Sequence, residues 1–231
     1  VAERPVCIII ECDTGQKRAG VVTPNEAVAL AKIVKDNRWL EFGGLMFYPP
    51  LGGWPRTQGF LDIVKEGLTG LGLVTNIIST GGTPNLINIG QLNGATEHRS
   101  GTSIFNDRMM MAAGVADIAD CALTIYTSVV SRAEDTRGIL DAGSKTFTLD
   151  TGGLDGFGLI LEHPTANIYK MAEEHGFLDV SNCETKPSVG DILQVVPNHV
   201  CVVVNMFDQI VAVRDNTIVD ILSVAARGRL V

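Results

Sequence analysis

Val-Cys-Ile-Ile-Ile at positions 6–10 is a continuous apolar run in which most side chains are β-branched. Such a run is typical of a parallel strand that is covered on both faces. A helix start follows it, because Thr23, Pro24 and Glu26 have the spacing of a capping box with proline at the first helical position. The apolar face of this predicted helix consists of Ala27, Leu30, Ala31 and Val34.

Two more strands, at Leu45–Tyr48 and Val74–Ser79, are predicted on either side of a helix near Gln58–Leu68. The three strands end at Cys12, Tyr48 and Ser79. These ends lie 36 and 31 residues apart, which is the length of a βα unit. The first part of the chain is therefore expected to be α/β, with a parallel sheet or barrel.

Beyond about residue 115 the pattern changes to short β-rich runs separated by turn residues, which predicts an antiparallel β domain. The predicted strands are Ala122–Val130, Gly138–Leu140, Ile192–Val196, Val200–Met206, Ile210–Val213 and Ile218–Val224. One helix is predicted at Pro164–His175, with Gly176 just past its end. We place the domain boundary between residues 112 and 113, so that the domains are 1–112 and 113–231.

Composition restricts the class of function. The 231 residues carry a net charge of −8, and 45% of them are hydrophobic, as in ordinary soluble globular proteins. An acidic chain without a dense Lys/Arg block argues against nucleic-acid or anionic-membrane partners, so we expect a small-molecule ligand. Five scattered cysteines indicate reduced thiols, and no signal peptide or spanning segment is visible, so a cytoplasmic location is expected. The chain opens at Val1 without a lead-in, which suggests a piece of a longer protein.

Two small-residue loops follow neighbouring predicted strands. Ser79-Thr80-Gly81-Gly82-Thr83-Pro84 can turn backbone N–H groups and hydroxyls toward a phosphate, although a glycine-rich turn with positive φ is the simpler interpretation of this segment alone. Arg99-Ser100-Gly101-Thr102 ends the next strand-like segment. In a parallel α/β architecture both loops would lie at the carboxyl ends of adjacent strands, where ligands bind.

A third strand end carries Glu11-Cys12-Asp13-Thr14-Gly15-Gln16-Lys17-Arg18-Ala19-Gly20. This segment places a carboxylate, a turn and a guanidinium together. An Asp-capped loop with a solvated Arg18 is the simpler interpretation of any such loop.

His199-Val200-Cys201 is the most specific local pattern. Residues i and i+2 of a strand point to the same face, so an imidazole and a thiolate could bind one metal ion, with sulfur favouring zinc over manganese or magnesium. Two protein ligands leave open positions for water or substrate, as catalysis requires. The alternative is a buried cysteine that packs as a small hydrophobe.

Two other segments have simple structural interpretations. Glu173-Glu174-His175-Gly176 would close the predicted helix with a histidine at its C-terminus. Asp141-Ala142-Gly143-Ser144-Lys145 would be a turn with a structural or solvated lysine.

These blocks, in this order and over nearly the whole chain, resemble the D-threonine aldolase and D-serine dehydratase family of alanine-racemase-like pyridoxal phosphate enzymes. The resemblance implies a (β/α)8 TIM-type barrel followed by a β domain, with residues 1 to about 110 forming the later half of the barrel. It further implies a pyridoxal phosphate- and metal-dependent lyase acting on β-hydroxy D-amino acids, with D-threonine aldolase favoured. D-serine dehydratase, or a non-catalytic protein that binds the cofactor, is the alternative.

The resemblance also assigns residues. Arg18 would hydrogen-bond the phenolic oxygen of the cofactor, and Tyr48 would line the pocket. The cofactor's phosphate would be held by residues of the two small-residue loops, namely Ser79, Gly81, Gly82, Thr83, Arg99, Gly101 and Thr102. His199 and Cys201 would bind the divalent metal, with zinc favoured and manganese as the alternative.

Two departures from the family pattern matter. Aldolases of the family often carry Asp where Cys201 stands, whereas the dehydratases resemble this chain. The Schiff-base lysine lies on the first barrel strand, and no lysine here has a matching context, so the catalytic lysine is not assigned in this chain. We expect the other half-barrel to come from a segment before Val1 or from another chain, and we expect a homodimer.

Overall fold

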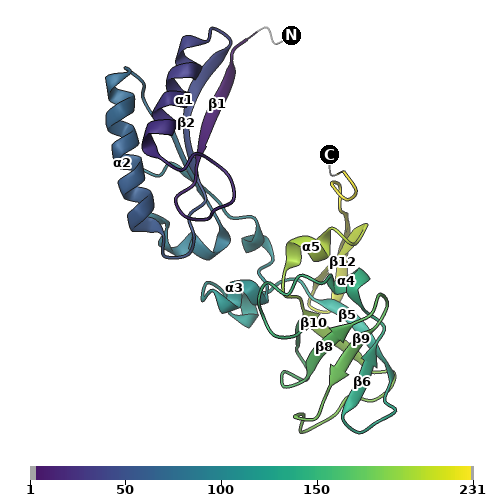
Figure 1. Cartoon of the computed structure of the whole chain (residues 1–231). Coiled ribbons are helices and arrows are strands. Elements are labelled where there is room, and N and C mark those ends of the chain that lie inside the picture. Colours follow the sequence, from purple (N-terminus) through teal and green to yellow (C-terminus); the bar gives the residue numbers. More distant parts are fainter. Residues whose placement is uncertain (1–3, 230–231) are drawn as a thin grey trace. The chain divides into compact units, whose positions relative to one another are not determined.

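A computed structural model describes residues 4–229, and the chain divides into two compact units, with the boundary in the sequence between Gly101 and Thr102 (Figure 1). This boundary lies 11 residues before the domain boundary predicted from the sequence. The expectation about the chain before Val1 lies outside the described residues. None of the described helices is long and apolar enough to cross a membrane.

The first unit is a four-stranded parallel sheet of order β1-β2-β3-β4 with helices packed against it. Figure 1 shows its two long helices, which contact each other, beside β1 and β2. The predicted parallel α/β unit is confirmed, but four strands do not close a barrel. The elements are β1 (Val6–Cys12), α1 (Pro24–Asp36), β2 (Leu40–Phe47), α2 (Trp54–Gly70), β3 (Ile77–Gly81), η1 (Thr83–Gln91) and β4 (Glu97–Arg99).

Local signals determine where α1 begins. The Glu26 backbone N–H donates to Oγ1 of Thr23 at 3.3 Å, and the Thr23 N–H donates to the Glu26 carboxylate at 2.9 Å, which confirms the predicted capping box. Between β2 and β3 the decisive residue is Gly44, since a Cβ at this position would lie 2.0 Å from the carbonyl oxygen of Ile77. The core beneath the helices consists of fully or almost fully buried side chains, among them Leu45, Phe47, Leu61, Val64 and Leu68.

The second unit contains a six-stranded antiparallel sheet of order β7-β10-β5-β6-β9-β8 and a separate hairpin, β11-β12. The predicted antiparallel β domain is confirmed. Its strands are β5 (Ile125–Ser131), β6 (Arg137–Leu140), β7 (Leu159–Ile160), β8 (Asn167–Met171), β9 (Gly176–Asp179), β10 (Ile192–Val196), β11 (Gln209–Arg214) and β12 (Thr217–Ser223). Its helical segments are η2 (Thr102–Ile104), α3 (Arg108–Ala112), η3 (Ile118–Asp120), α4 (Ser144–Phe147) and α5 (Val200–Val204).

The helix predicted at Pro164–His175 is wrong, because this segment contains β8 and the turn into β9. Ile168 pairs with Leu178 across the two strands, and both side chains are fully buried in the sheet core. Gly176 is a strand residue rather than a helix end. A Cβ there would lie 2.8 Å from the carbonyl oxygen of Ala142, so close packing requires glycine.

The strand predicted at Val200–Met206 is also wrong, because α5 occupies this segment. The backbone N–H of Val200 donates to Oδ2 of the buried Asp107 at 3.0 Å, which satisfies a free donor of the first helical turn. Val200 and Val203, three residues apart, are both buried. Tertiary contacts thus override the β propensity of this valine-rich run.

Two of the blocks quoted above pack against each other in the second unit. A Cβ at Gly143 would lie 2.3 Å from the Ala172 carbonyl oxygen, so only glycine fits at this position. Lys145 bridges the carboxylates of Glu173 at 3.0 Å and Glu174 at 2.6 Å. These hydrogen bonds and charges raise the pKa of Lys145 to about 12. Lys145 thus pairs with two carboxylates as a structural residue, but it lies in α4 rather than in the predicted turn.

Candidate functional site

Several of the predicted cofactor-binding residues of the first unit meet where its parallel strands end. Arg99, at the end of β4, donates from Nη1 to the hydroxyl of the buried Ser79 and from Nη2 to the Phe47 carbonyl oxygen at 3.3 Å. Its side chain therefore reaches from β4 past β3 to the end of β2. The guanidinium carbon of Arg18 lies 4.4 Å from the centre of the Tyr48 ring, a cation–π distance.

The loop after β3 closes around the same place. Gly82 has a φ of 102°, and a Cβ on it would lie 3.2 Å from Cζ of Tyr48. A Cβ on Gly81 would lie 2.9 Å from Nη2 of Arg99. The structure thus brings together the predicted residues Arg18, Tyr48, Ser79, Gly81, Gly82 and Arg99 at one edge of the sheet.

His98 is a contributor that the sequence analysis missed. Its Nδ1 lies 2.7 Å from Oγ1 of Thr80, and its Nε2 lies 3.1 Å from the Gly82 carbonyl oxygen. The two strands bring Thr80 and His98 into register, so the imidazole fixes the loop that follows β3. In the sequence, the only indication of this role was that His98 lies directly before Arg99-Ser100-Gly101-Thr102.

The loop after β1 has the Asp-capped form that was the simpler interpretation. Oδ1 of Asp13 accepts hydrogen bonds from the backbone of Gly15 at 2.8 Å and of Lys17 at 3.1 Å. These bonds lower the pKa of Asp13. Arg18 is mostly exposed and lies 3.8 Å from the Glu11 carboxylate, yet its stacking on Tyr48 directs it toward the strand ends.

The other phosphate-binding candidates lie further along the chain. Thr83 is buried and begins η1, directly after Gly82. Gly101 ends the first unit, and Thr102 begins the second unit and η2. A joint anion site made by both small-residue loops stays a prediction.

The His199–Cys201 pair lies in the second unit, at the start of α5. His199 is the residue before the helix, and Cys201 is in its first turn. Nδ1 of His199 lies 2.8 Å from Oδ2 of Asp150, and Oγ1 of Thr102 lies 3.7 Å from Sγ of Cys201. The imidazole and the thiol lie close enough for each to shift the pKa of the other.

These contacts shift both pKa values in the sense of an ion pair. The hydrogen bond to Cys201, with the one to Asp150, raises the pKa of His199 to about 9 against the opposing effect of burial. The hydrogen bond from His199 lowers the pKa of Cys201. A lower pKa increases the fraction of the thiolate, which is the form that binds metals.

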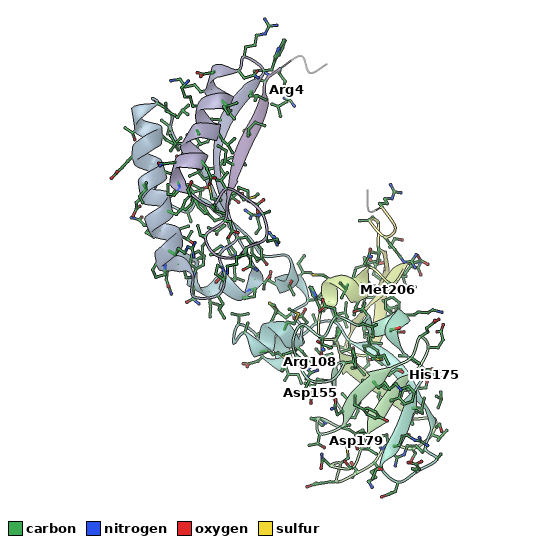
Figure 2. All side chains as sticks on the ribbon, in the orientation of Figure 1. Arg4, Arg108, Asp155, His175, Asp179 and Met206 are labelled. Atoms are coloured by element: carbon green, nitrogen blue, oxygen red, sulfur yellow. The ribbon has the colours of Figure 1, made fainter. Side chains whose placement is uncertain are left out.

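A cavity of about 580 Å³ opens beside the pair. It is lined by Thr148, Asp150, Cys201, Val202, Asn205 and Met206, and Figure 2 labels Met206. Within residues 4–229, no three His, Cys, Asp or Glu side chains form a group that could hold a metal. The pair therefore supplies two ligands, which fits an ion with open positions rather than a closed structural site.

Comparisons with known proteins show what the chain is similar to. Residues 122–213 match the family model described as "Putative serine dehydratase domain". An uncharacterized protein of Mycobacterium tuberculosis is 37% identical over 131 residues, which span 54% of this chain and 98% of that protein. The D-threonine aldolase of an Arthrobacter species is 28% identical over 96% of this chain and 61% of its own length.

Among solved structures, the D-threonine aldolase from Filomicrobium marinum superposes with a TM-score of 0.86 at 24% identity. The match covers 98% of this chain and 65% of that protein, so the two share a fold. The chain belongs to the D-threonine aldolase and D-serine dehydratase family. It spans less than two thirds of the length of these two aldolases.

Proposed function

We propose that the protein carrying this chain is a lyase that uses pyridoxal phosphate and a divalent metal to act on β-hydroxy D-amino acids, with D-threonine aldolase as the favoured activity. The observation that carries the proposal is the His199–Cys201 pair, held by Asp150 inside the segment that matches the serine dehydratase domain. Two soft ligands leave coordination positions of the metal open, and such a metal can also bind a substrate oxygen.

The strand ends of the first unit fit the cofactor. Gly81 and Gly82 leave room that a Cβ would fill against Arg99 and Tyr48, while Ser79 and Arg99 supply a hydroxyl and a positive charge. Small residues, donors and a cation at the carboxyl ends of parallel strands suit a phosphate. When bound, pyridoxal phosphate supplies an electron sink for the bond that breaks at the substrate Cα.

The chain's own residues have separate tasks in this proposal. Arg18, stacked on Tyr48, would donate to the phenolic oxygen of the cofactor. His98 holds the loop after β3 in place through the Gly82 carbonyl. His199 and Cys201 would hold the metal, zinc being favoured by the thiolate, and such a metal would supply Lewis acidity toward the β-hydroxyl.

The cavity beside Cys201 favours an uncharged β-substituent. Its described lining includes the apolar Val202 and Met206 and the carboxylate of Asp150, and it contains neither Lys nor Arg. The second carboxylate of a substrate such as 3-hydroxyaspartate would lie near the Asp150 carboxylate and find no Lys or Arg in this lining. D-threonine, with a methyl group at this position, suits the cavity better.

Aldol cleavage and dehydration use the same bound substrate. Loss of the hydroxyl proton breaks the Cα–Cβ bond and gives glycine and an aldehyde, whereas loss of the Cα proton expels the hydroxyl and leads to a keto acid and ammonia. The Asp13–Gly20 and Thr96–Asp107 segments resemble the aldolases, and Cys201 resembles the dehydratases. D-serine dehydratase is therefore the second candidate.

The first unit supports the idea of half a barrel. The outer edge of β1 has no partner strand among the described residues, and Val6 on it is 49% exposed. An exposed strand edge offers its unpaired backbone groups to a further strand. We propose that the missing strands and the Schiff-base lysine come from a segment before Val1 or from another chain, that the protein is a homodimer, and that it is cytoplasmic.

The test uses the protein purified at its natural length, supplied with pyridoxal phosphate and with Zn²⁺ or Mn²⁺. We expect acetaldehyde and glycine from D-threonine, no product from L-threonine, and loss of activity after chelation that returns with metal. Pyruvate and ammonia from D-serine, without acetaldehyde from D-threonine, would instead establish the dehydratase. Cofactor binding without either product would establish the non-catalytic alternative, and absence of both binding and turnover would refute the proposal.

A further inference from the structure

We propose that Asp150 and Thr102 are positioning residues for the metal-binding pair, with Asp150 orienting the His199 imidazole and the Thr102 hydroxyl orienting the Cys201 sulfur. The inference rests on the proposed function only in taking His199 and Cys201 as metal ligands. Both contacts lie within the second unit.

The Asp150 carboxylate is fixed through both of its oxygens. Oδ1 accepts a hydrogen bond from the backbone N–H of Gly152 at 3.0 Å, and Oδ2 lies 2.8 Å from Nδ1 of His199. A carboxylate only accepts, so Nδ1 donates to Asp150, and Nε2 is the nitrogen left to bind an ion once it has lost its own proton. An acceptor of this kind sets both the tautomer and the ring orientation of a metal-binding histidine.

The backbone before Asp150 is held in an unfavourable conformation. Thr148 has φ 64° and ψ −174°, a region that β-branched residues rarely adopt. Its Oγ1 accepts a hydrogen bond from the Asp150 backbone N–H at 3.2 Å. The loop therefore stores strain at the point where it directs the Asp150 carboxylate toward His199.

Stability alone does not explain the Asp150–His199 contact. The side chains are 45% and 27% exposed, and exposed ion pairs contribute little to folding. Nor does Asp150 act as a third ligand, since no three candidate side chains among the described residues could share an ion. Its effect on a metal would be exerted through His199.

Thr102 makes the matching contact to the other ligand. Its Oγ1 lies 3.7 Å from Sγ of Cys201, within hydrogen-bonding distance for sulfur. A hydroxyl that donates to a thiolate limits its rotation and tunes its strength as a ligand.

The experiment measures Co²⁺ binding by the full-length protein, without substrate, from the thiolate-to-cobalt charge-transfer band and by competition with a chromophoric chelator. Asp150→Ala should weaken binding by about 10- to 100-fold. Asp150→Asn should weaken it less, because the amide oxygen can still accept from Nδ1. Thr102→Val should shift the charge-transfer band and weaken binding, and Thr102→Ser should restore both.

Asp155→Asn is the control for charge, because Asp155 lies in the same unit but contacts Arg108 through its backbone oxygen (Figure 2). The positioning roles are refuted if wild type binds Co²⁺ and the Asp150 and Thr102 variants bind it as tightly as this control with an unchanged band. If wild type and His199→Ala both fail to bind Co²⁺, the metal site itself is wrong, and the proposed function fails with it. Should Asp150→Ala not fold, the near-isosteric Asp150→Asn decides the same question.

Discussion

Asp107 is the residue whose replacement should do most damage to the architecture of the second unit. Its carboxylate is completely buried, and it accepts one hydrogen bond from the Met110 backbone N–H and one from the Val200 backbone N–H, both at 3.0 Å. Asp107 thus caps α3 and satisfies the first turn of α5, and Met110 and Val200 are themselves buried. Hydrogen bonds to a charged acceptor contribute about 1.5–3 kcal/mol each.

Asp107→Ala should therefore lower the stability of the second unit by about 3–6 kcal/mol, because two buried N–H groups lose their acceptor. Asp107→Asn should lower it by about half as much, because the amide keeps one oxygen and presents its NH₂ to the other donor. The control is Thr23→Ala, which removes an exposed cap of α1 and should cost about 1 kcal/mol.

Amide hydrogen exchange followed by mass spectrometry reads the two units separately. Peptides that contain Met110, Val200 and the strands behind them should lose protection in the Asp107 variants, while peptides from α2 keep theirs. If both variants lost less than about 1 kcal/mol of stability in the second unit, or if α2 lost as much, the carboxylate would not be what holds α3 and α5 together.

Three further predictions concern the packing. Gly44→Ala should destabilise the first unit by more than about 2 kcal/mol, because its Cβ would lie 2.0 Å from the Ile77 carbonyl oxygen. The control Gly59→Ala, in α2 with open space around it, should instead stabilise the unit by about 0.5–1 kcal/mol. Urea unfolding measures both changes. Leu178→Ala, which empties a fully buried site in β9, should cost about 2–5 kcal/mol by the same assay. Burial raises the pKa of the Cys12 thiol from 9.0 to about 12, so the folded state favours the neutral thiol and this contribution to stability should be lost as the pH rises from about 9 to 12. A Cys12→Ala variant whose alkaline unfolding midpoint matched wild type would contradict this.

The sequence was sufficient wherever the structure depends on neighbouring residues. Thr23, Pro24 and Glu26 mark the start of α1 by themselves, since all partners of the cap lie within three residues. The segment 164–175 failed because its sheet pairing depends on distant partners. Ile168 belongs to a strand through Leu178 and the buried core of the second unit, and a single sequence does not display that pairing.

The proximity of His199 and Cys201 was predicted from strand geometry, and the strand is absent, yet the two side chains do meet. In a regular helix, residues i and i+2 point in divergent directions. His199 precedes α5 and has an extended backbone, with φ −139° and ψ 102°. Its side chain therefore does not point in the direction that a helical residue would impose, and it lies near Cys201 in the first turn. The helix itself depends on Asp107, 93 residues away from Val200, and the orientation of the imidazole depends on Asp150, 49 residues away from His199. The two ligands could therefore be found from their spacing, but the carboxylates that hold the helix and the imidazole could be identified only once the fold had placed them there.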